Sequence, residues 1–187
     1  MQEKKNNIRI SSGFFKGNYI HIKNNCNIRP TSSRLKITLF SYVKQYLKNS
    51  VCLDLFAGSG ALGIEAASMG AKKVVLVEKN YIVINRLKEN IKRLDIKNLK
   101  TYNMEAMYYL LHTKEKFNLI FLDPPYKLDI ISTIIQTVIK KKILSNNGFI
   151  YFELNNLYFF YERFPQIHIH IIKKVGNTFF CLLQYRR

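Results

Sequence analysis

The chain has 187 residues, 48% of them hydrophobic, which is enough to bury a core in one domain without disulfides or a structural metal. Thirty Lys and Arg against 12 Asp and Glu give a formal net charge of +18, which predicts attraction to polyanions and says nothing about the fold. Three scattered cysteines without a CxxC pair argue against a zinc site, and no apolar run reaches the length of a membrane span. The polar, basic start shows no signal peptide, so we expect a cytoplasmic protein without a membrane partner or a bound metal.

The basic excess is concentrated at the start of the chain, where the first 50 residues hold ten Lys or Arg and one acid, Glu3. A coding bias toward Lys, Ile and Asn explains part of the charge but not this distribution. Apolar runs at Asn7–Ile10 and Tyr19–Ile22 predict two short strands, and the apolar spacing within Arg34–Lys48 predicts a helix. We therefore expect residues 1–50 to form a basic extension, a β-hairpin plus a helix, packed on a main domain of residues 51–187.

From position 51 onward, short apolar runs alternate with amphipathic segments, a pattern typical of right-handed βαβ units. The predicted strands are Val51–Phe56, Lys73–Glu78, Leu99–Asn103, Phe117–Leu122 and Phe149–Leu154. The predicted helices are Ala61–Met69, Tyr81–Leu94, Glu105–His112 and Ile130–Lys142. Apolar runs at Ile167–Ile172 and Thr178–Leu183 flank a Gly-Asn turn and predict a closing hairpin. The fold class is therefore α/β: a mostly parallel, doubly wound, Rossmann-like sheet with a C-terminal antiparallel hairpin.

A glycine-rich turn follows the first strand of this sheet and opens a helix. In doubly wound sheets, ligands bind beyond the carboxyl ends of the strands, and glycines let the backbone approach them closely. The spacing of Gly58, Gly60 and Gly63 satisfies G-x-G-x-x-G, which also fits a nicotinamide enzyme. Asp54 favours the cationic S-adenosylmethionine over a pyrophosphate, although a structural cap is a competing interpretation. The candidate cofactor contacts in this turn are Asp54, Phe56, Gly58 and Gly60.

Two further acids follow the next two strands. Glu78 ends its strand 18 residues after Gly60, where an acid can accept both hydroxyls of a ribose. Glu105, followed by Ala106, opens the helix after the third strand. There it could meet an adenine amino group or serve only as an acid in a first helical turn, and the sequence leaves both interpretations open.

The tetrapeptide Asp123-Pro124-Pro125-Tyr126 follows the apolar strand that ends at residue 122. An exocyclic amine on a base is a poor nucleophile, because its lone pair is delocalised into the ring. Hydrogen bonds from that amine to Asp123 and the Pro124 carbonyl would direct the lone pair, and Tyr126 could stack on a base taken out of its stack. This chemistry requires neither a metal nor a covalent intermediate. The competing interpretation is a rigid Pro-Pro turn with a capping Asp.

On these motifs the chain resembles class I S-adenosylmethionine-dependent methyltransferases, whose N-methylating members carry a tetrapeptide like residues 123–126. Among these, it most resembles the bacterial small-subunit (16S) ribosomal RNA guanine-N2 methyltransferases. The resemblance implies S-adenosylmethionine as cofactor, guanine N2 as acceptor, and ribosomal RNA as partner, within the small subunit or its assembly intermediate. The matching segments are Arg9–Gly13, Lys16-Gly17, Arg29-Pro30-Thr31, Arg34, Leu39-Phe40, Asp54–Gly63, Ala106-Met107 and Asp123–Tyr126.

The Arg-Pro-Thr segment is the discriminating part, because many methyltransferases share the glycine turn and the tetrapeptide. Ser33 and Ile37 stand where similar members usually carry acids, a departure that concerns RNA contacts and leaves the reaction type intact. Arginines at a helix start can clamp phosphates bidentately. The residues expected to contact RNA are Arg9, Lys16, Arg29, Thr31 and Arg34.

Three other functions fit part of the pattern. An adenine-N6 DNA methyltransferase could use the same tetrapeptide, but such enzymes normally carry an added region that reads base edges. A ribosome-assembly binder with an inactive methyltransferase fold would not need an intact Asp123 and Tyr126. A nicotinamide oxidoreductase lacks a well-placed histidine, since the four histidines are dispersed. No coiled-coil seam is evident, and we expect a monomer.

Overall fold

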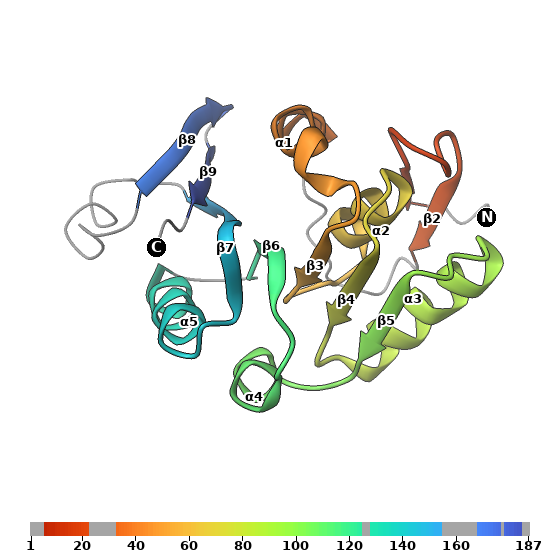
Figure 1. Ribbon diagram of the computed structural model, residues 1–187. Coiled ribbons are helices and arrows are strands. Elements are labelled where there is room, and N and C mark those ends of the chain that lie inside the picture. Colours follow the sequence, from red (N-terminus) through yellow and green to blue (C-terminus); the bar gives the residue numbers. More distant parts are fainter. Residues whose placement is uncertain (1–5, 23–32, 125–127, 155–167, 177, 185–187) are drawn as a thin grey trace.

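The computed structural model describes residues 6–22, 33–124, 128–154, 168–176 and 178–184. A seven-stranded sheet has the order β5-β4-β3-β6-β7-β9-β8, and β1 and β2 form a separate antiparallel pair (Figure 1). The strands are β1 (Asn6–Arg9), β2 (Tyr19–Ile22), β3 (Val51–Asp54), β4 (Lys73–Val77), β5 (Leu99–Tyr102), β6 (Phe117–Leu122), β7 (Leu144–Leu154), β8 (His168–Val175) and β9 (Thr178–Gln184). The helices are α1 (Ser33–Leu47), α2 (Ala61–Ser68), α3 (Tyr81–Arg93), α4 (Ala106–His112) and α5 (Leu128–Lys140).

The direction in which the chain adds strands reverses at β3. From β3 it proceeds to β4 and β5 on one side, and then crosses to β6 and β7 on the other, with all of these pairings parallel. Asp54 at the end of β3 is opposite Phe121, two residues before Asp123. The carboxyl ends of β3 and β6 therefore flank the switch point, where ligands of doubly wound sheets bind.

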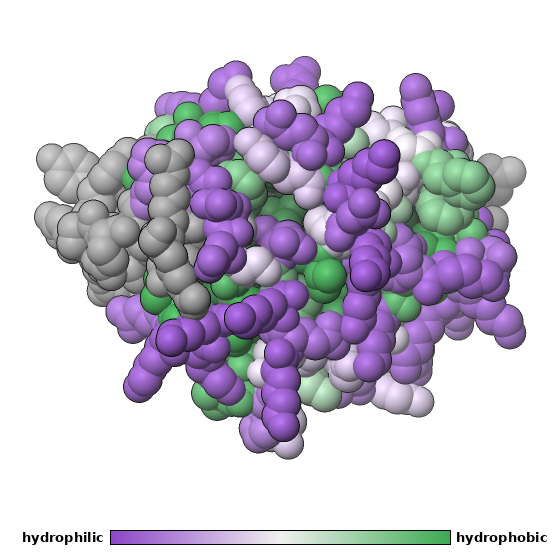
Figure 2. All heavy atoms as spheres, viewed as in Figure 1, coloured by the Kyte–Doolittle hydropathy of each residue, from purple (hydrophilic) through white to green (hydrophobic). Residues whose placement is uncertain are grey.

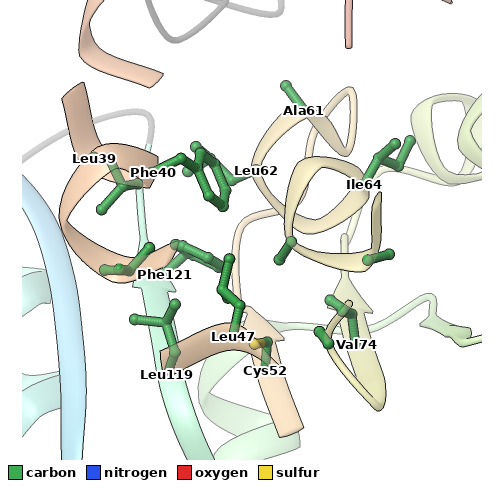
Figure 3. Packing of buried hydrophobic residues seen from close by; sticks show 14 of the residues in the cluster. Leu39, Phe40, Leu47, Cys52, Ala61, Leu62, Ile64, Val74, Leu119 and Phe121 are labelled. Carbon is green, nitrogen blue, oxygen red and sulfur yellow. The ribbon is translucent and has the colours of Figure 1, made fainter. Parts of the chain in front are cut away.

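Each face of the sheet has its own hydrophobic core. One core lies under α1, α2 and α3, and the other lies under α4 and α5. Figure 3 shows the first core, where Phe40 of α1, Leu62 of α2 and Phe121 of β6 point toward one another. Because the central strands are buried on both faces, their sequences are continuous apolar runs rather than alternating ones. The face of the molecule in Figure 2 is covered mainly by hydrophilic side chains, in keeping with the net charge.

Ile10 and Ile20, which come from the β1–β2 pair, are buried in the same core as α1 and α2. Residues before and after position 50 therefore share one core. Their assignment as an extension and a main domain stays a prediction.

The predicted fold class and order of elements agree with the structure, with most bounds within about two residues and those of the last strands further off. β7 begins at Leu144 rather than at the predicted Phe149. Phe117 pairs with Leu144 and Leu119 with Phe149, so several extra residues on β7 bulge out between these pairs. Their Ser-Asn-Asn-Gly sequence is typical of a turn, and Asn147 has a φ of 57°, which is why the sequence pattern placed a break here.

Candidate active site

Asp54 is the last residue of β3 and only 2% of it is exposed. Its Oδ2 accepts a hydrogen bond from the backbone N–H of Gly63 at 3.0 Å, so the capping role considered for it is present. Burial raises the pKa of Asp54 to about 7. This value is the net result of several effects: burial is the largest, the negative charges of Asp123 and Glu78 also raise the pKa, and the backbone N–H groups of Gly63 and Phe56 lower it. A nearby cation would favour the ionised form of this carboxyl group.

The glycine turn brings α2 close to the neighbouring strand and helix. Gly60 precedes α2 with a φ of 78°, and a Cβ placed on it would lie 2.4 Å from Leu87 Cδ1. A Cβ on Gly63 would lie 2.2 Å from Leu76 Cδ2 on β4. A larger side chain at Gly63 would require Leu76 to move and would crowd the contact between the Gly63 N–H and Asp54, and one at Gly60 would strain the backbone, because φ is positive there.

Glu78 follows β4 and holds the glycine turn from the adjacent strand. Its Oε2 accepts from the Gly58 N–H at 3.0 Å, and its Oε1 accepts from the Asn80 N–H at 2.7 Å. The Asn103 side chain donates to the backbone carbonyls of Glu78 and Lys79, both at 2.9 Å. Sequence reasoning missed both asparagines. Asn80 carries a signal, since its side chain caps the first turn of α3, whereas Asn103 shows none.

Glu105 lies at the start of α4, where its carbonyl accepts from the Tyr109 N–H at 3.0 Å. Its side chain makes no capping hydrogen bond, and its Oε1 lies 3.5 Å from Lys79 Nζ. Both of these side chains are about two-thirds exposed, so the pair contributes little to stability. Ala106, the first residue of α4, is buried. The carboxylate of Glu105 is thus available at the same edge of the sheet, and both interpretations of it remain open.

Asp123 and Pro124 follow β6 and are half-buried. Asp54, Glu78 and Asp123, which we call the acid cluster, occupy the carboxyl ends of three adjacent strands, and Asp54 interacts electrostatically with the other two. In a chain with a net charge of +18, this is a locally negative site that suits a cationic ligand. Tyr126, the predicted stacking residue, lies outside the described residues.

Of the residues predicted to contact RNA, the three that the structure describes do not all lie together. Arg9, Lys16 and Arg34 are all exposed, and Arg29 and Thr31 lie outside the described residues. Arg34 lies in the first turn of α1. This helix runs antiparallel to the strands, with Phe40 near Phe121 late in β6 and Tyr46 near Phe149, which is opposite Leu119 earlier in β6.

Arg34 is therefore at the edge that carries the acid cluster. Lys16 lies elsewhere, in the turn between β1 and β2. The neighbouring Phe15 donates its N–H to Ser68 Oγ at 2.9 Å, and Ser68 is the last residue of α2. The structure thus places Lys16 at the end of α2 that faces away from the glycine turn.

A buried ion pair that sequence reasoning missed joins the N-terminal segment to α2. Lys36 and Glu65 are 2% and 1% exposed, with Lys36 Nζ 2.7 Å from Glu65 Oε2. Lys36 Nζ also donates to the Arg9 carbonyl at 2.8 Å, and the Ser11 N–H donates to both oxygens of Glu65. The sequence did contain a sign that Lys36 is buried. Position 36 lies on the same face of α1 as positions 40, 43 and 47, which are all apolar.

The residues that the structure describes contain neither a candidate metal site nor a candidate membrane span. No group of three or more His, Cys, Asp or Glu among them is arranged to hold a metal ion. In the same part of the chain, no helix combines the length and apolar character needed to cross a membrane.

The strand order and the acid-bearing turns define a Rossmann-like methyltransferase. The Escherichia coli structure described as "Putative methyltransferase yhhF" superposes with a TM-score of 0.85 at 27% identity, covering 97% of this chain and 99% of that one. A structure from Haemophilus influenzae, also described as a methylase, superposes with a TM-score of 0.77 at 29% identity and the same coverage.

Comparison with relatives gives the family. Residues 8–184 match the family model described as "Conserved hypothetical protein 95". The chain is 42% identical over 151 residues to Ribosomal RNA small subunit methyltransferase D of Buchnera aphidicola subsp. Acyrthosiphon pisum, covering 80% of this chain and 79% of the relative. Identity to the Escherichia coli K12 protein of that name is 33% over 146 residues, 78% of this chain and 74% of the relative. The chain belongs to the ribosomal RNA small subunit methyltransferase D family, which confirms the resemblance seen in its motifs.

Proposed function

We propose that this chain transfers the methyl group of S-adenosylmethionine to the exocyclic N2 of a guanine in 16S ribosomal RNA. The observation that carries the proposal is the acid cluster at the switch point of a methyltransferase sheet, with the family tetrapeptide beginning at Asp123. The names of the relatives support small-subunit ribosomal RNA as the substrate. The choice of guanine N2 rests on the motif resemblance.

The residues at the carboxyl edge fit S-adenosylmethionine. The ligand carries a sulfonium and an amino cation, and Asp54 and Asp123 supply negative charge near the turn. Gly58 and Gly60 keep the turn free of side chains, and Glu78 is held beside it, where a carboxylate can accept from ribose hydroxyls. Glu105 and Ala106 begin the helix after β5 and would adjoin the adenine. The bound cofactor would supply the electrophilic methyl group.

Asp123 would act as a hydrogen-bond acceptor in the chemical step. Its carboxylate and the Pro124 carbonyl would accept from the two N–H groups of the target amine and direct its lone pair. The nitrogen becomes acidic once it has been methylated and cationic, so a strong base is not required. Tyr126 would stack on the extruded base. Arg9, Lys16, Arg29, Thr31 and Arg34 would contact the RNA backbone.

The test is methyl transfer from labelled donor to ribosomal RNA purified from cells that lack this gene. The expected product is N2-methylguanine, identified by nucleoside analysis. N6-methyladenine would replace the guanine assignment with the adenine alternative. Absence of transfer to RNA in free or subunit form would favour a non-catalytic assembly factor.

A further inference from the structure

The turn between β1 and β2 packs against the end of α2 that lies away from the acid cluster (Figure 1). The Phe14 N–H donates to the Ser68 carbonyl at 2.7 Å, and Ser68 Oγ donates to the Ser12 carbonyl at 2.6 Å. Gly13 has a φ of 78°, and a Cβ on it would lie 1.9 Å from the Ser68 oxygen. This close approach fixes the position of the turn.

Loops from the beginnings of three strands adjoin this turn. The Lys72 N–H donates to the Ser50 carbonyl at 2.8 Å, which joins the loop before β4 to the loop before β3. The Asn98 side chain donates to the Ala71 carbonyl at 2.7 Å, which adds the loop before β5. These four segments therefore form one continuous surface at the amino edge of the sheet, where the parallel strands begin.

The exposed side chains on this surface include four lysines and one phenylalanine, beside the smaller Asn18, Asn49 and Asp95. Phe14 is 88% exposed, although it is a large apolar residue. We define the amino-edge platform as Phe14, Lys16, Lys48, Lys72 and Lys97, all of them exposed. Residues 10–18, 48–50, 69–72 and 94–98 contain one acid, Asp95, which pairs with Lys97.

Helix dipoles explain only part of this composition. Lys48 directly follows α1, where a cation is favourable next to the helix C-terminus. Lys72 and Lys97 lie several residues beyond the ends of α2 and α3, outside the last helical turns. A helix terminus also gives no reason for exposing Phe14. Lysines interleaved with an exposed aromatic ring are typical of surfaces that bind unpaired nucleic acid.

We propose that the amino-edge platform binds an unpaired segment of the same RNA molecule that presents the target guanine to the acid cluster. Bases stack on Phe14, and Lys48, Lys72 and Lys97 join Lys16 in contacting phosphates. This proposal rests on the proposed function and adds a second contact to it. α2 separates the two edges by about 12 Å, so the RNA passes along the side of the molecule. The preferred substrate is then a folded RNA with a flanking unpaired segment rather than a minimal hairpin that carries the target base.

The aromatic part of the platform is tested with Phe14→Ala and Phe14→Tyr. Affinity is measured for a 16S RNA fragment with the flanking segment and for a minimal hairpin without it. We expect Phe14→Ala to bind the long fragment roughly 5- to 100-fold more weakly, with Phe14→Tyr near the parent because stacking survives. Hairpin affinity should be the same in all three proteins. Parental affinity of Phe14→Ala for the long fragment would overturn the stacking contact.

The basic part is tested with the double variant Lys48→Gln/Lys72→Gln. Its matched control is Lys44→Gln/Lys88→Gln, which removes the same charge from exposed positions on α1 and α3. We expect the slope of log affinity against log salt to fall by about 1 to 2 in the platform variant and to change much less in the control. Equal falls would mean that only net charge matters and would overturn the platform.

Competition and methylation assays separate the remaining outcomes. Duplex DNA of equal length that competes as well as the RNA would overturn the assignment of an unpaired RNA partner. If the parent enzyme methylates no ribosomal RNA, the proposed function fails. If the parent methylates ribosomal RNA but the platform variants bind the long fragment with parental affinity, the platform proposal is wrong and the proposed function still stands.

Discussion

The two edges of the sheet have opposite electrostatic character. At the carboxyl edge, Asp54 interacts electrostatically with Glu78 and Asp123, and burial keeps Asp54 near its ionisation midpoint at neutral pH. At the amino edge, the four platform lysines are accompanied by Asp95, which pairs with one of them, Lys97, and by Glu115 before β6, which pairs with Lys73. The charge of +18 is therefore not spread evenly. A site suited to a cation and a surface suited to a polyanion can coexist in one small domain when they lie at opposite edges of the sheet.

Asp123→Asn should produce the largest effect. The variant keeps the shape of the side chain but replaces one acceptor oxygen with a donor, which misorients the target amine. Loss of such a transition-state hydrogen bond typically costs on the order of 10²–10³ in rate. Single-turnover methylation measures this fall, and S-adenosylmethionine affinity should change little. Methylation at the parental rate would mean that residues 123–126 form only a turn.

Glu78→Ala should weaken S-adenosylmethionine binding by roughly 10- to 100-fold, because hydrogen bonds to a charged group contribute about 1.5–3 kcal/mol. Calorimetry measures the affinity. RNA binding should keep its parental salt dependence, since Glu78 lies at the carboxyl edge.

Glu78→Gln is the matched control for this variant. It retains one acceptor for the Gly58 N–H and should lose less affinity than the alanine variant. Undiminished affinity in Glu78→Ala would remove the ribose assignment.

Cofactor binding should also depend on pH through Asp54. Its pKa of about 7 in the fold exceeds the ordinary value of 3.8, so the folded state holds a proton that the unfolded chain has lost. The free energy of unfolding should therefore fall as pH rises from about 4 to above 7. The ionised carboxylate favours a cation, so S-adenosylmethionine affinity should rise by up to about tenfold between pH 6 and 8.

Asp54→Asn should remove both trends, and its melting temperature should exceed that of the parent above pH 7. Calorimetry and thermal unfolding across this pH range measure the two effects. A flat affinity profile in the parent enzyme would show that Asp54 does not sense the charge of the ligand.

Arg34→Ala should have the smallest effect of the four. Removing one phosphate contact lowers the salt slope of RNA binding by about 1 and leaves S-adenosylmethionine binding unchanged. Lys44→Ala, also exposed on α1, is the control. Equal slopes in both variants and the parent would make Arg34 an ordinary solvated side chain.

Local sequence patterns predicted most of this fold. Strands buried on both faces appear as uninterrupted apolar runs, and the alternation of strands and helices leaves few topologies. The same rule places Asp54, Glu78 and Asp123 at one edge, because each follows a strand of the parallel sheet. The features that sequence patterns could not predict depend on contacts between residues that are distant in the sequence. The bulge in β7 resembles a turn locally, and the place of Lys16 depends on Ser68, more than fifty residues away.

The ion pair between Lys36 and Glu65 has a practical consequence for separating the two binding activities proposed for the chain. Deleting the first dozen residues would remove more than basic charge. It would remove the Arg9 carbonyl, which accepts from Lys36, and the Ser11 N–H, which donates to Glu65. Both of these side chains have almost no other access to polar partners or water. Such a deletion would loosen α2, the helix that opens at the glycine turn. RNA capture and cofactor binding can therefore be uncoupled by replacing exposed side chains, but not by shortening the chain.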